Sequence, residues 1–251
     1  MKKIVIMGAS SGIGLGCAEA LVARGVKVGL AARHLESIKA LSDRYPGMVE
    51  YMAIDVTKKD APEKLNKLIG RLGGMDIYFH VAGIGYENTD LDPEREVAIF
   101  ETNTCGFVRC ISAAWRYFRD QGKRGHIAAV TSVAGTNGIG RLSAYSGSKA
   151  ACQKWLVALE QLTNNRGLDI RFTDIRPGWV DTPLLVKGDK YPLEMEPDYA
   201  VPKVLRAIAK KKRVAVIDWR WGIVVGLWRM IPNCLYTRLD IPVTLPGSRT
   251  E

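Results

Sequence analysis

Short β-branched runs alternate with longer amphipathic segments along most of this chain, and this alternation constrains the fold more than any other feature. Strands are predicted at 3–7, 26–31, 49–54, 76–80, 126–131, 169–175 and 214–217. Helices are predicted at 12–24, 35–44, 63–72, 143–164 and 198–210, and at 94–120 as one or two helices. Strands that alternate with helices form a parallel sheet, and right-handed crossovers make it doubly wound. We therefore predict an α/β fold in which helices cover both faces of a central parallel sheet of about seven strands.

Length and composition favour one globular domain. At 251 residues the chain can bury a substantial core, and no linker, repeat or low-complexity segment divides it. Five cysteines without paired spacing indicate reduced thiols and a cytoplasmic location, and no metal site is expected. No stretch of about 20 apolar residues predicts a membrane span. The net charge of +10 suits an anionic ligand or surface, but no nucleic-acid-binding module is found.

A glycine-rich turn, Gly8-x-x-x-Gly12-x-Gly14, separates the first predicted strand from the first predicted helix. Glycines permit a tight turn and close approach of the backbone to a ligand, and a helix N-terminus attracts phosphate groups. Ser10 and Ser11 can add hydroxyl donors. Such a turn can be purely structural, but at the carboxyl end of a strand it indicates the dinucleotide site of a Rossmann-type domain.

The end of the second predicted strand bears on the choice of cofactor. A carboxylate there would bind the ribose hydroxyls and select NAD, whereas an arginine would hold the 2′-phosphate of NADP. This chain has Ala32 in the acidic position, followed by Arg33 and His34. We therefore predict NADP(H), with NAD as the alternative if Arg33 is only a solvated surface residue. Asp55 and Val56, after the third strand, are expected to flank the adenine, unless Asp55 caps a helix.

Tyr145 and Lys149 stand four residues apart on a predicted helix, so they share one face, one turn from each other. An ammonium that close stabilises a phenolate and makes the tyrosine a usable general acid and base. Tyr-x-x-x-Lys is common by chance on exposed helices, so the surrounding residues decide whether this pair is catalytic. Ser132 ends the fifth predicted strand thirteen residues earlier, and Asn103 lies in the helical region after the fourth.

With these motifs in this order, the chain resembles the short-chain dehydrogenases/reductases from Lys3 to about Ile217. The matching segments are Gly8-x-x-x-Gly12-Ile13-Gly14, Asn103, Ser132, Tyr145-x-x-x-Lys149 and Pro177-Gly178-Trp179-Val180-x-Thr182. The family usually has Asn-Ala-Gly after the fourth strand, where this chain has Val81-Ala82-Gly83. Because the family's asparagine stabilises the central sheet, Val81 is expected to alter local packing rather than chemistry.

The resemblance implies that Tyr145 gives a proton to a carbonyl oxygen as hydride arrives from a nicotinamide, and takes it back in reverse. It also implies that Lys149 assists the tyrosine and binds the nicotinamide ribose, that Ser132 polarises the carbonyl, and that Asn103 positions a water near Lys149. The expected cofactor-binding residues are Gly8, Ser10, Ser11, Gly12, Ile13, Gly14, Arg33, Asp55, Val56, Ala82, Gly83, Tyr145, Lys149, Pro177, Gly178, Val180 and Thr182.

Residues 1–217 are then expected to form the dinucleotide-binding and catalytic part of the domain. Within them, 183–197 corresponds to a lid over the substrate in the family. The lid can present an apolar wall made of Leu184, Leu185 and Val186. The loop 135–142 is expected to border the same pocket.

A Trp- and Arg-rich extension, 218–251, lies beyond the resemblance and is expected to pack on the same domain. The apolar residues that recur there at helical spacing are Trp221, Val224, Val225, Trp228 and Ile231. This face can cover the chain's own pocket or another subunit. Membrane-surface contact through 219–235, beside the basic run 210–213, is the less favoured alternative.

The sequence therefore predicts an NADPH-dependent oxidoreductase that reversibly reduces a ketone or aldehyde to an alcohol, with an apolar substrate favoured by the lid and the extension. The alternatives are an NAD-dependent alcohol dehydrogenase and a sensor or scaffold that binds NADP(H) without turnover. Apolar faces at 100–118 and 143–163 resemble the family's dimer-forming helices and imply a homodimer or homotetramer.

Overall fold

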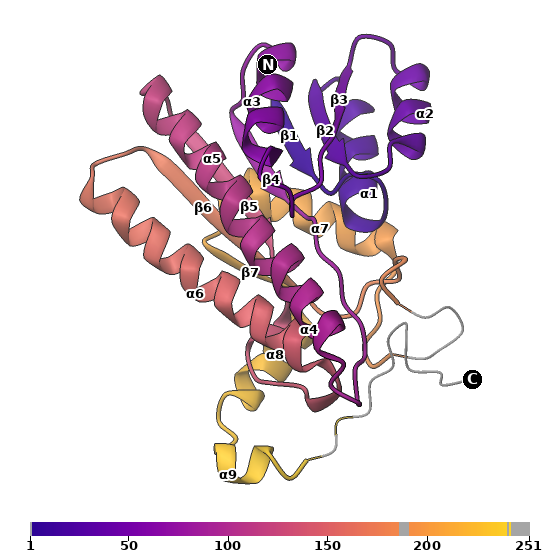
Figure 1. Ribbon diagram of the computed structural model, residues 1–251, viewed down its shortest axis with the longest axis vertical. Helices are drawn as coiled ribbons and strands as arrows, with labels where there is room; N and C mark the ends of the chain where they lie inside the picture. Colours follow the sequence, from indigo (N-terminus) through magenta and orange to yellow (C-terminus); the bar gives the residue numbers. More distant parts are fainter. Residues whose placement is uncertain (1, 186–190, 240, 242–251) are drawn as a thin grey trace.

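A computed structural model, which describes residues 2–185, 191–239 and 241, confirms the predicted parallel sheet (Figure 1). The strands are β1 (Ile4–Met7), β2 (Val28–Ala32), β3 (Val49–Ala53), β4 (Ile77–His80), β5 (Gly125–Val130), β6 (Ile170–Pro177) and β7 (Val214–Ile217). They lie in the order β3-β2-β1-β4-β5-β6-β7, and all neighbouring pairs are parallel. The direction of winding changes between β1 and β4, and doubly wound sheets bind ligands beside the carboxyl ends at that point.

Helices connect the strands, as the alternating pattern predicted. The α-helices are α1 (Gly12–Val22), α2 (Glu36–Arg44), α3 (Ala61–Leu72), α4 (Pro93–Phe100), α5 (Phe107–Gln121), α6 (Ser143–Asn165), α7 (Pro197–Ala209), α8 (Trp219–Trp228) and α9 (Asn233–Tyr236). The shorter turns are the π-helical η1 (Glu101–Gly106) and the 3₁₀ turns η2 (Val133–Gly135) and η3 (Gly140–Leu142).

Alternation of side chains along the strands divides the core into two layers. On β1, Ile4 and Ile6 belong to the layer that contains α1, α2 and α7, whereas Val5 and Met7 belong to the layer that contains α3, α5 and α6. Both faces of the sheet are therefore buried. This explains why the strands read as nearly continuous apolar runs in the sequence.

The π turn η1 interrupts the helical region predicted at 94–120. It joins α4 to α5, and it contains Asn103. A π turn adds one residue to a helical turn and so displaces the side chains that follow. Helical periodicity predicted the two flanking helices, but nothing in the local sequence announced this turn.

The chain continues from β7 directly into α8, which places α8 at the carboxyl edge of the sheet. The basic run 210–213 precedes β7 and therefore lies at the amino edge, separated from α8 by about 13 Å of strand. The expectation that this run lies beside the tryptophans of the extension is wrong. Among the described residues, no helix combines the length and the apolar character that a membrane span requires.

Candidate active site

The glycine turn between β1 and α1 brings backbone atoms close together. Gly8 has a φ of +91°, and a Cβ there would overlap the backbone nitrogen of Ala82. A Cβ on Gly14 would overlap the carbonyl oxygen of Gly8. Ser11 is the N-cap of α1, but its side chain makes no capping hydrogen bond, so its hydroxyl is available to a ligand. The turn has the shape and the donors that suit a pyrophosphate at a helix N-terminus.

The ends of β2 and β3 carry one cation and one carboxylate toward this turn. Ala32 is buried, and the exposed Arg33 makes no hydrogen bond or ion pair with any described residue. Burial opposes ionisation of Asp55, but hydrogen bonds from Thr57, with the charges of Arg33 and Lys58, hold the pKa of its carboxyl below the ordinary value. Asp55 accepts from the Thr57 N–H at 2.9 Å and so closes a local turn instead of capping a helix.

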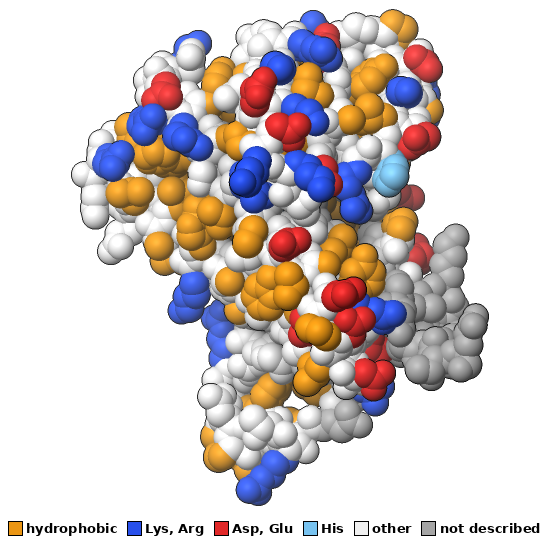
Figure 2. All heavy atoms as spheres, viewed as in Figure 1, with side chains coloured by type: hydrophobic (Ala, Val, Ile, Leu, Met, Phe, Trp, Pro, Cys, Tyr) orange, Lys and Arg blue, Asp and Glu red, His pale blue; other side chains and the backbone are white. Residues whose placement is uncertain are grey.

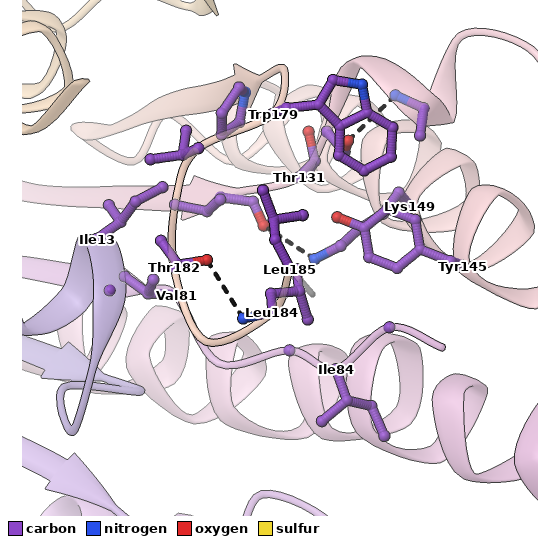
Figure 3. A pocket seen from close by; sticks show the side chains of 18 of the residues that line it. Ile13, Val81, Ile84, Thr131, Tyr145, Lys149, Trp179, Thr182, Leu184 and Leu185 are labelled. Atoms are coloured by element: carbon purple, nitrogen blue, oxygen red, sulfur yellow. Dashed lines mark hydrogen bonds between the residues drawn. The ribbon is translucent and has the colours of Figure 1, made fainter. Parts of the chain in front are cut away.

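Three predicted catalytic side chains, those of Ser132, Tyr145 and Lys149, meet beyond the carboxyl end of β5. Figure 3 shows two of them, Tyr145 and Lys149. The Nζ of Lys149 lies 5.6 Å from the centroid of the Tyr145 ring, and Lys149 is only 4% exposed. Its Nζ donates to the carbonyl oxygen of Val130 at 3.4 Å. Ser132, the second residue after β5, accepts a hydrogen bond at Oγ from the Ala134 N–H at 3.1 Å, so its hydroxyl proton can point elsewhere.

Asn103 lies behind these residues and does not line the cavity. Its side chain exchanges two hydrogen bonds with the backbone of Ile84, each 2.8 Å long, and Nδ2 also donates to Ser148 Oγ at 3.2 Å. The contacts tie η1 to the loop after β4 and to α6. A Cβ on Gly83 would lie 3.2 Å from both Asn103 Oδ1 and Lys149 Nζ, so the amide and the ammonium adjoin one another. Positioning of a water by Asn103 stays a prediction.

The loop after β4, where Val81 stands in place of the family's asparagine, is attached to β1 through its backbone. The backbone N–H groups of Val81 and Ala82 both donate to the Met7 carbonyl, at 2.8 and 2.9 Å, and so hold the loop on β1. His80 Nδ1 lies 2.9 Å from the Tyr78 hydroxyl, while its Nε2 has no partner among the described residues. Burial, with the nearby charge of Lys149, lowers the pKa of His80 to about 3. His80 therefore stays neutral at physiological pH.

Gln153 is a site residue that the sequence analysis missed. Its Nε2 donates to the Ser132 carbonyl at 2.7 Å and to Thr131 Oγ1 at 3.4 Å. Gln153 stands four residues after Lys149 on α6, so Tyr145, Lys149 and Gln153 form one polar stripe on the helix. That spacing was the available signal, and it continues the pattern of the predicted pair by one more turn.

A cavity of about 750 Å³ extends from the glycine turn to α8. Every predicted site residue lines it except Gly14, which packs against Gly8, and Asn103. Ile13 and Thr182 lie on one side of the cavity in Figure 3, and Tyr145 and Trp179 lie on the other. The motifs that bind a nucleotide in related folds and the Tyr–Lys pair thus share one space.

One wall of the cavity is apolar. Leu184 and Leu185 of the lid contribute to it, as do Trp221, Val224 and Trp228 of α8. Val186, the third residue expected in this wall, falls outside the described residues, together with the rest of the lid segment 186–190. A pocket lined in this way favours a ligand with a sizeable apolar part.

Long-range contacts hold α8 and α9 against the cavity. A Cβ on Gly178 would overlap the indole of Trp221, which packs directly on the segment after β6. The Asn137 side chain donates to the Trp228 carbonyl at 3.0 Å, and the Tyr236 hydroxyl donates to the Gly138 carbonyl at 2.7 Å. The loop 135–142 is therefore clamped to the extension.

The fold and the site together are those of a Rossmann-type oxidoreductase. A family model described as short chain dehydrogenase matches residues 2–191. The chain belongs to the short-chain dehydrogenase family.

Curated relatives cover nearly the whole chain. An uncharacterised oxidoreductase of Myxococcus xanthus is 33% identical over 239 residues, which is 92% of this chain and 93% of that protein. Dehydrogenase/reductase SDR family member 7B of Bos taurus is 29% identical over 258 residues, 93% of this chain and 78% of that protein. These names support an enzyme of the oxidoreductase class.

Solved structures agree with the fold. An alcohol dehydrogenase from Thermococcus sibiricus, complexed with 5-hydroxy-NADP, has a TM-score of 0.73 and 30% identity, and the match covers 86% of this chain and 95% of that one. A short-chain dehydrogenase/reductase from Burkholderia phymatum in complex with NAD has a TM-score of 0.83 over 97% of this chain and 98% of that one. At 19% identity the second match shows the fold alone. The structural neighbours thus include proteins that bind NADP-type and NAD cofactors.

Proposed function

We propose that the protein is an NADP(H)-dependent oxidoreductase that reduces an apolar ketone or aldehyde to the alcohol and can run in reverse. The observation that carries this proposal is the meeting of Ser132, Tyr145 and Lys149 in the same cavity as the glycine turn. A proton donor and a nucleotide site in one enclosed space are what carbonyl reduction requires.

The residues around the glycine turn fit NADP(H). Backbone N–H groups at the start of α1 would bind the pyrophosphate, and the unpaired Arg33 guanidinium would bind the 2′-phosphate. The segment Pro177–Gly178 would support the nicotinamide. When bound, the cofactor supplies or accepts hydride at the substrate carbon.

The chain's own side chains manage the proton and the developing charge. The Tyr145 hydroxyl gives its proton to the substrate oxygen, which also accepts a hydrogen bond from Ser132 Oγ. The buried ammonium of Lys149 offsets the negative charge left on the phenolate. Gln153 keeps the backbone of Ser132 in place through its hydrogen bond to the carbonyl oxygen. The apolar wall keeps water from the site and holds the rest of the substrate.

A panel of carbonyl compounds with NADPH tests this function by the absorbance of the reduced nicotinamide. The panel spans small ketones, acyl β-ketones, steroid ketones and sphingoid ketones. We expect consumption of NADPH with large apolar carbonyls and little with small polar ones. Unchanged absorbance across the panel, with NADPH binding intact, would instead favour a nucleotide sensor without turnover. A preference for NADH would overturn the choice of cofactor.

A further inference from the structure

Six large apolar side chains on α8, α9 and the residues around them are exposed, and we call them the outer face. They are Trp219 (70% exposed), Ile223 (55%), Leu227 (57%), Met230 (70%), Leu235 (55%) and Leu239 (53%). Thirteen large apolar side chains are exposed in the whole described chain, so nearly half of them fall within these 21 residues. Such a concentration marks a surface that meets an apolar partner.

Most of the outer face is the reverse side of a wall of the cavity, whereas Leu239 also lines the cavity itself. Trp221 and Val225 are each 5% exposed, and Trp221, Val224 and Trp228 line the cavity from within. Apart from Arg220, α8 is thus apolar on all sides, although only its inner side is covered by the described chain. A helix that is apolar all round is stable when both sides are covered.

The outer face is held rigidly. Asp218, 3% exposed, caps α8 by accepting from the Arg220 N–H at 3.1 Å, and it also accepts from the Tyr199 hydroxyl at 2.8 Å. The ring centroids of Trp228 and Tyr236 lie 6.0 Å apart, and this contact joins α8 to α9. The exposed side chains therefore belong to a fixed surface and not to a loose tail.

The charges on this segment are all positive. Residues 219–239 contain three arginines and no acidic residue. Arg220 pairs with the buried Asp218 at 3.1 Å, while Arg229 and Arg238 form no ion pair with a described residue. In Figure 2 the tip of the molecule formed by α9 shows orange and blue spheres, and red spheres gather over the segment that leads into α4. Exposed Trp and Leu beside unpaired Arg match the surface of a lipid bilayer, where apolar acyl chains lie beneath phosphate headgroups.

We propose that α8 and α9 dock this protein on the surface of an anionic lipid bilayer. The outer face enters the headgroup region, and Arg229 and Arg238 bind lipid phosphates. A second copy of the chain fits less well, because a stable interface takes about 800 Å² and 20 to 30 residues from each partner. Six side chains on two short helices fall short of that extent.

Docking would place one wall of the cavity against the bilayer. Since Trp221 and Trp228 line the cavity from the same helix, an apolar substrate dissolved in lipid would have a short path to Tyr145. This consequence rests on the proposed function, whereas the docking itself does not. The test of docking therefore needs no substrate.

Vesicle flotation of the full chain tests the docking. The vesicles are phosphatidylcholine alone, or phosphatidylcholine and phosphatidylglycerol in equal parts, each at low and high salt. We expect the protein to float with the anionic vesicles. The fraction that floats with the neutral vesicles should be at least tenfold smaller, and high salt should reduce flotation with the anionic ones. The double variant Ile223→Asp/Leu227→Asp should lose flotation, and Arg229→Glu/Arg238→Glu should lose most of it.

Two control variants make changes of the same kind at the amino edge of the sheet, one apolar-to-acidic substitution and one double charge reversal. Val214→Asp replaces a side chain that is 41% exposed, and Arg71→Glu/Lys123→Glu reverses two surface charges. Both should float as the original chain does, and all variants should keep the circular-dichroism spectrum of the original chain, which checks folding without a cofactor. The proposal is overturned if the original chain does not float with anionic vesicles. It is also overturned if Arg71→Glu/Lys123→Glu reduces flotation as much as Arg229→Glu/Arg238→Glu does. It is also overturned if Ile223→Asp/Leu227→Asp abolishes a dimer in solution but not flotation.

Discussion

Arg33 is the side chain on which the choice between NADP(H) and NAD(H) depends most. Its guanidinium is exposed at the end of β2 and unpaired among the described residues, while Ala32 offers no carboxylate to a ribose. We predict that Arg33→Ala weakens NADPH binding by about tenfold to hundredfold, or about 1.4 to 2.8 kcal/mol, because a charged hydrogen bond to phosphate is lost. NADH binding should not change. Calorimetric titration of both cofactors measures this, with His34→Ala as the neighbouring control; equal losses for the two cofactors would contradict it.

His126 makes stability depend on pH. Burial, with the charges of Lys211 and Lys2 nearby, lowers the pKa of His126 to about 4 from 6.5, and its Nε2 shares a 2.8 Å hydrogen bond with Thr173 Oγ1. His126 of the unfolded chain binds a proton as the pH falls below about 6.5, whereas in the folded chain it stays neutral until the pH approaches 4. The stabilisation is therefore complete above pH 6.5 and declines as the pH falls toward 4, by about 1.4 kcal/mol per pH unit for each histidine.

Denaturant unfolding between about pH 7 and pH 5 measures this dependence. His126→Gln keeps a hydrogen-bonding group near Thr173. It should reduce the slope of the unfolding free energy against pH by the amount that corresponds to the uptake of one proton on unfolding. The buried His80 should supply a second proton to the slope for the same reason. An unchanged slope in His126→Gln would show that His126 is protonated in the folded state.

At the scale of elements, the contact between α8 and the segment after β6 links the extension to the cofactor site. The Trp221 indole occupies the space of a Gly178 side chain and donates from Nε1 to the Leu193 carbonyl at 3.3 Å. We predict that Gly178→Ala displaces α8 and destabilises the protein by about 1 to 3 kcal/mol. The temperature of thermal unfolding and the affinity for NADPH should both decrease. Gly222→Ala on α8, where a Cβ meets nothing within 4 Å, should leave both unchanged or raise stability.

The elements themselves were largely predictable from the sequence, and the exceptions have physical reasons. Buried parallel strands are short apolar runs that end at turn residues, so β1 to β7 differ from the predicted ranges by only a few residues. The π turn η1 escaped prediction because its residues, 101–106, carry no distinctive local pattern. In α8 helical spacing did pick out the inner side, since Trp221, Val224 and Trp228 line the cavity and Val225 is buried. Because almost every other side chain of α8 is also apolar, the spacing did not show that the opposite side is exposed.

The site was predictable as far as its motifs were local. The glycine turn and the Tyr145–Lys149 pair are each short segments whose chemistry follows from spacing. The contacts from Asn137 to Trp228 and from Gly138 to Tyr236 join residues about 90 to 100 positions apart, and no local pattern reveals them. The apolar wall of the cavity depends on these contacts, which is why the sequence indicated an apolar substrate without defining its pocket.

At the scale of the whole molecule, we propose a homodimer through α5 and α6. Val157 and Leu162 on α6 are 46% and 41% exposed, although both are apolar. Val157→Glu/Leu162→Glu should convert dimers to monomers, because buried glutamates without partners oppose association. Light scattering after gel filtration measures the mass. Leu235→Glu on α9 is the matched control and should leave the mass unchanged; monomers in the original chain would contradict the proposal.

The central claim is that this whole arrangement serves proton transfer by Tyr145 beside a bound NADP(H). The most direct measurement compares Tyr145→Phe with the original protein, using the best carbonyl of the panel, for turnover and for NADPH affinity. Removing one hydroxyl should lower turnover by about 10² to 10⁴ and change the dissociation constant of NADPH by no more than about threefold. Turnover that survives in Tyr145→Phe, with NADPH still bound, would contradict the account.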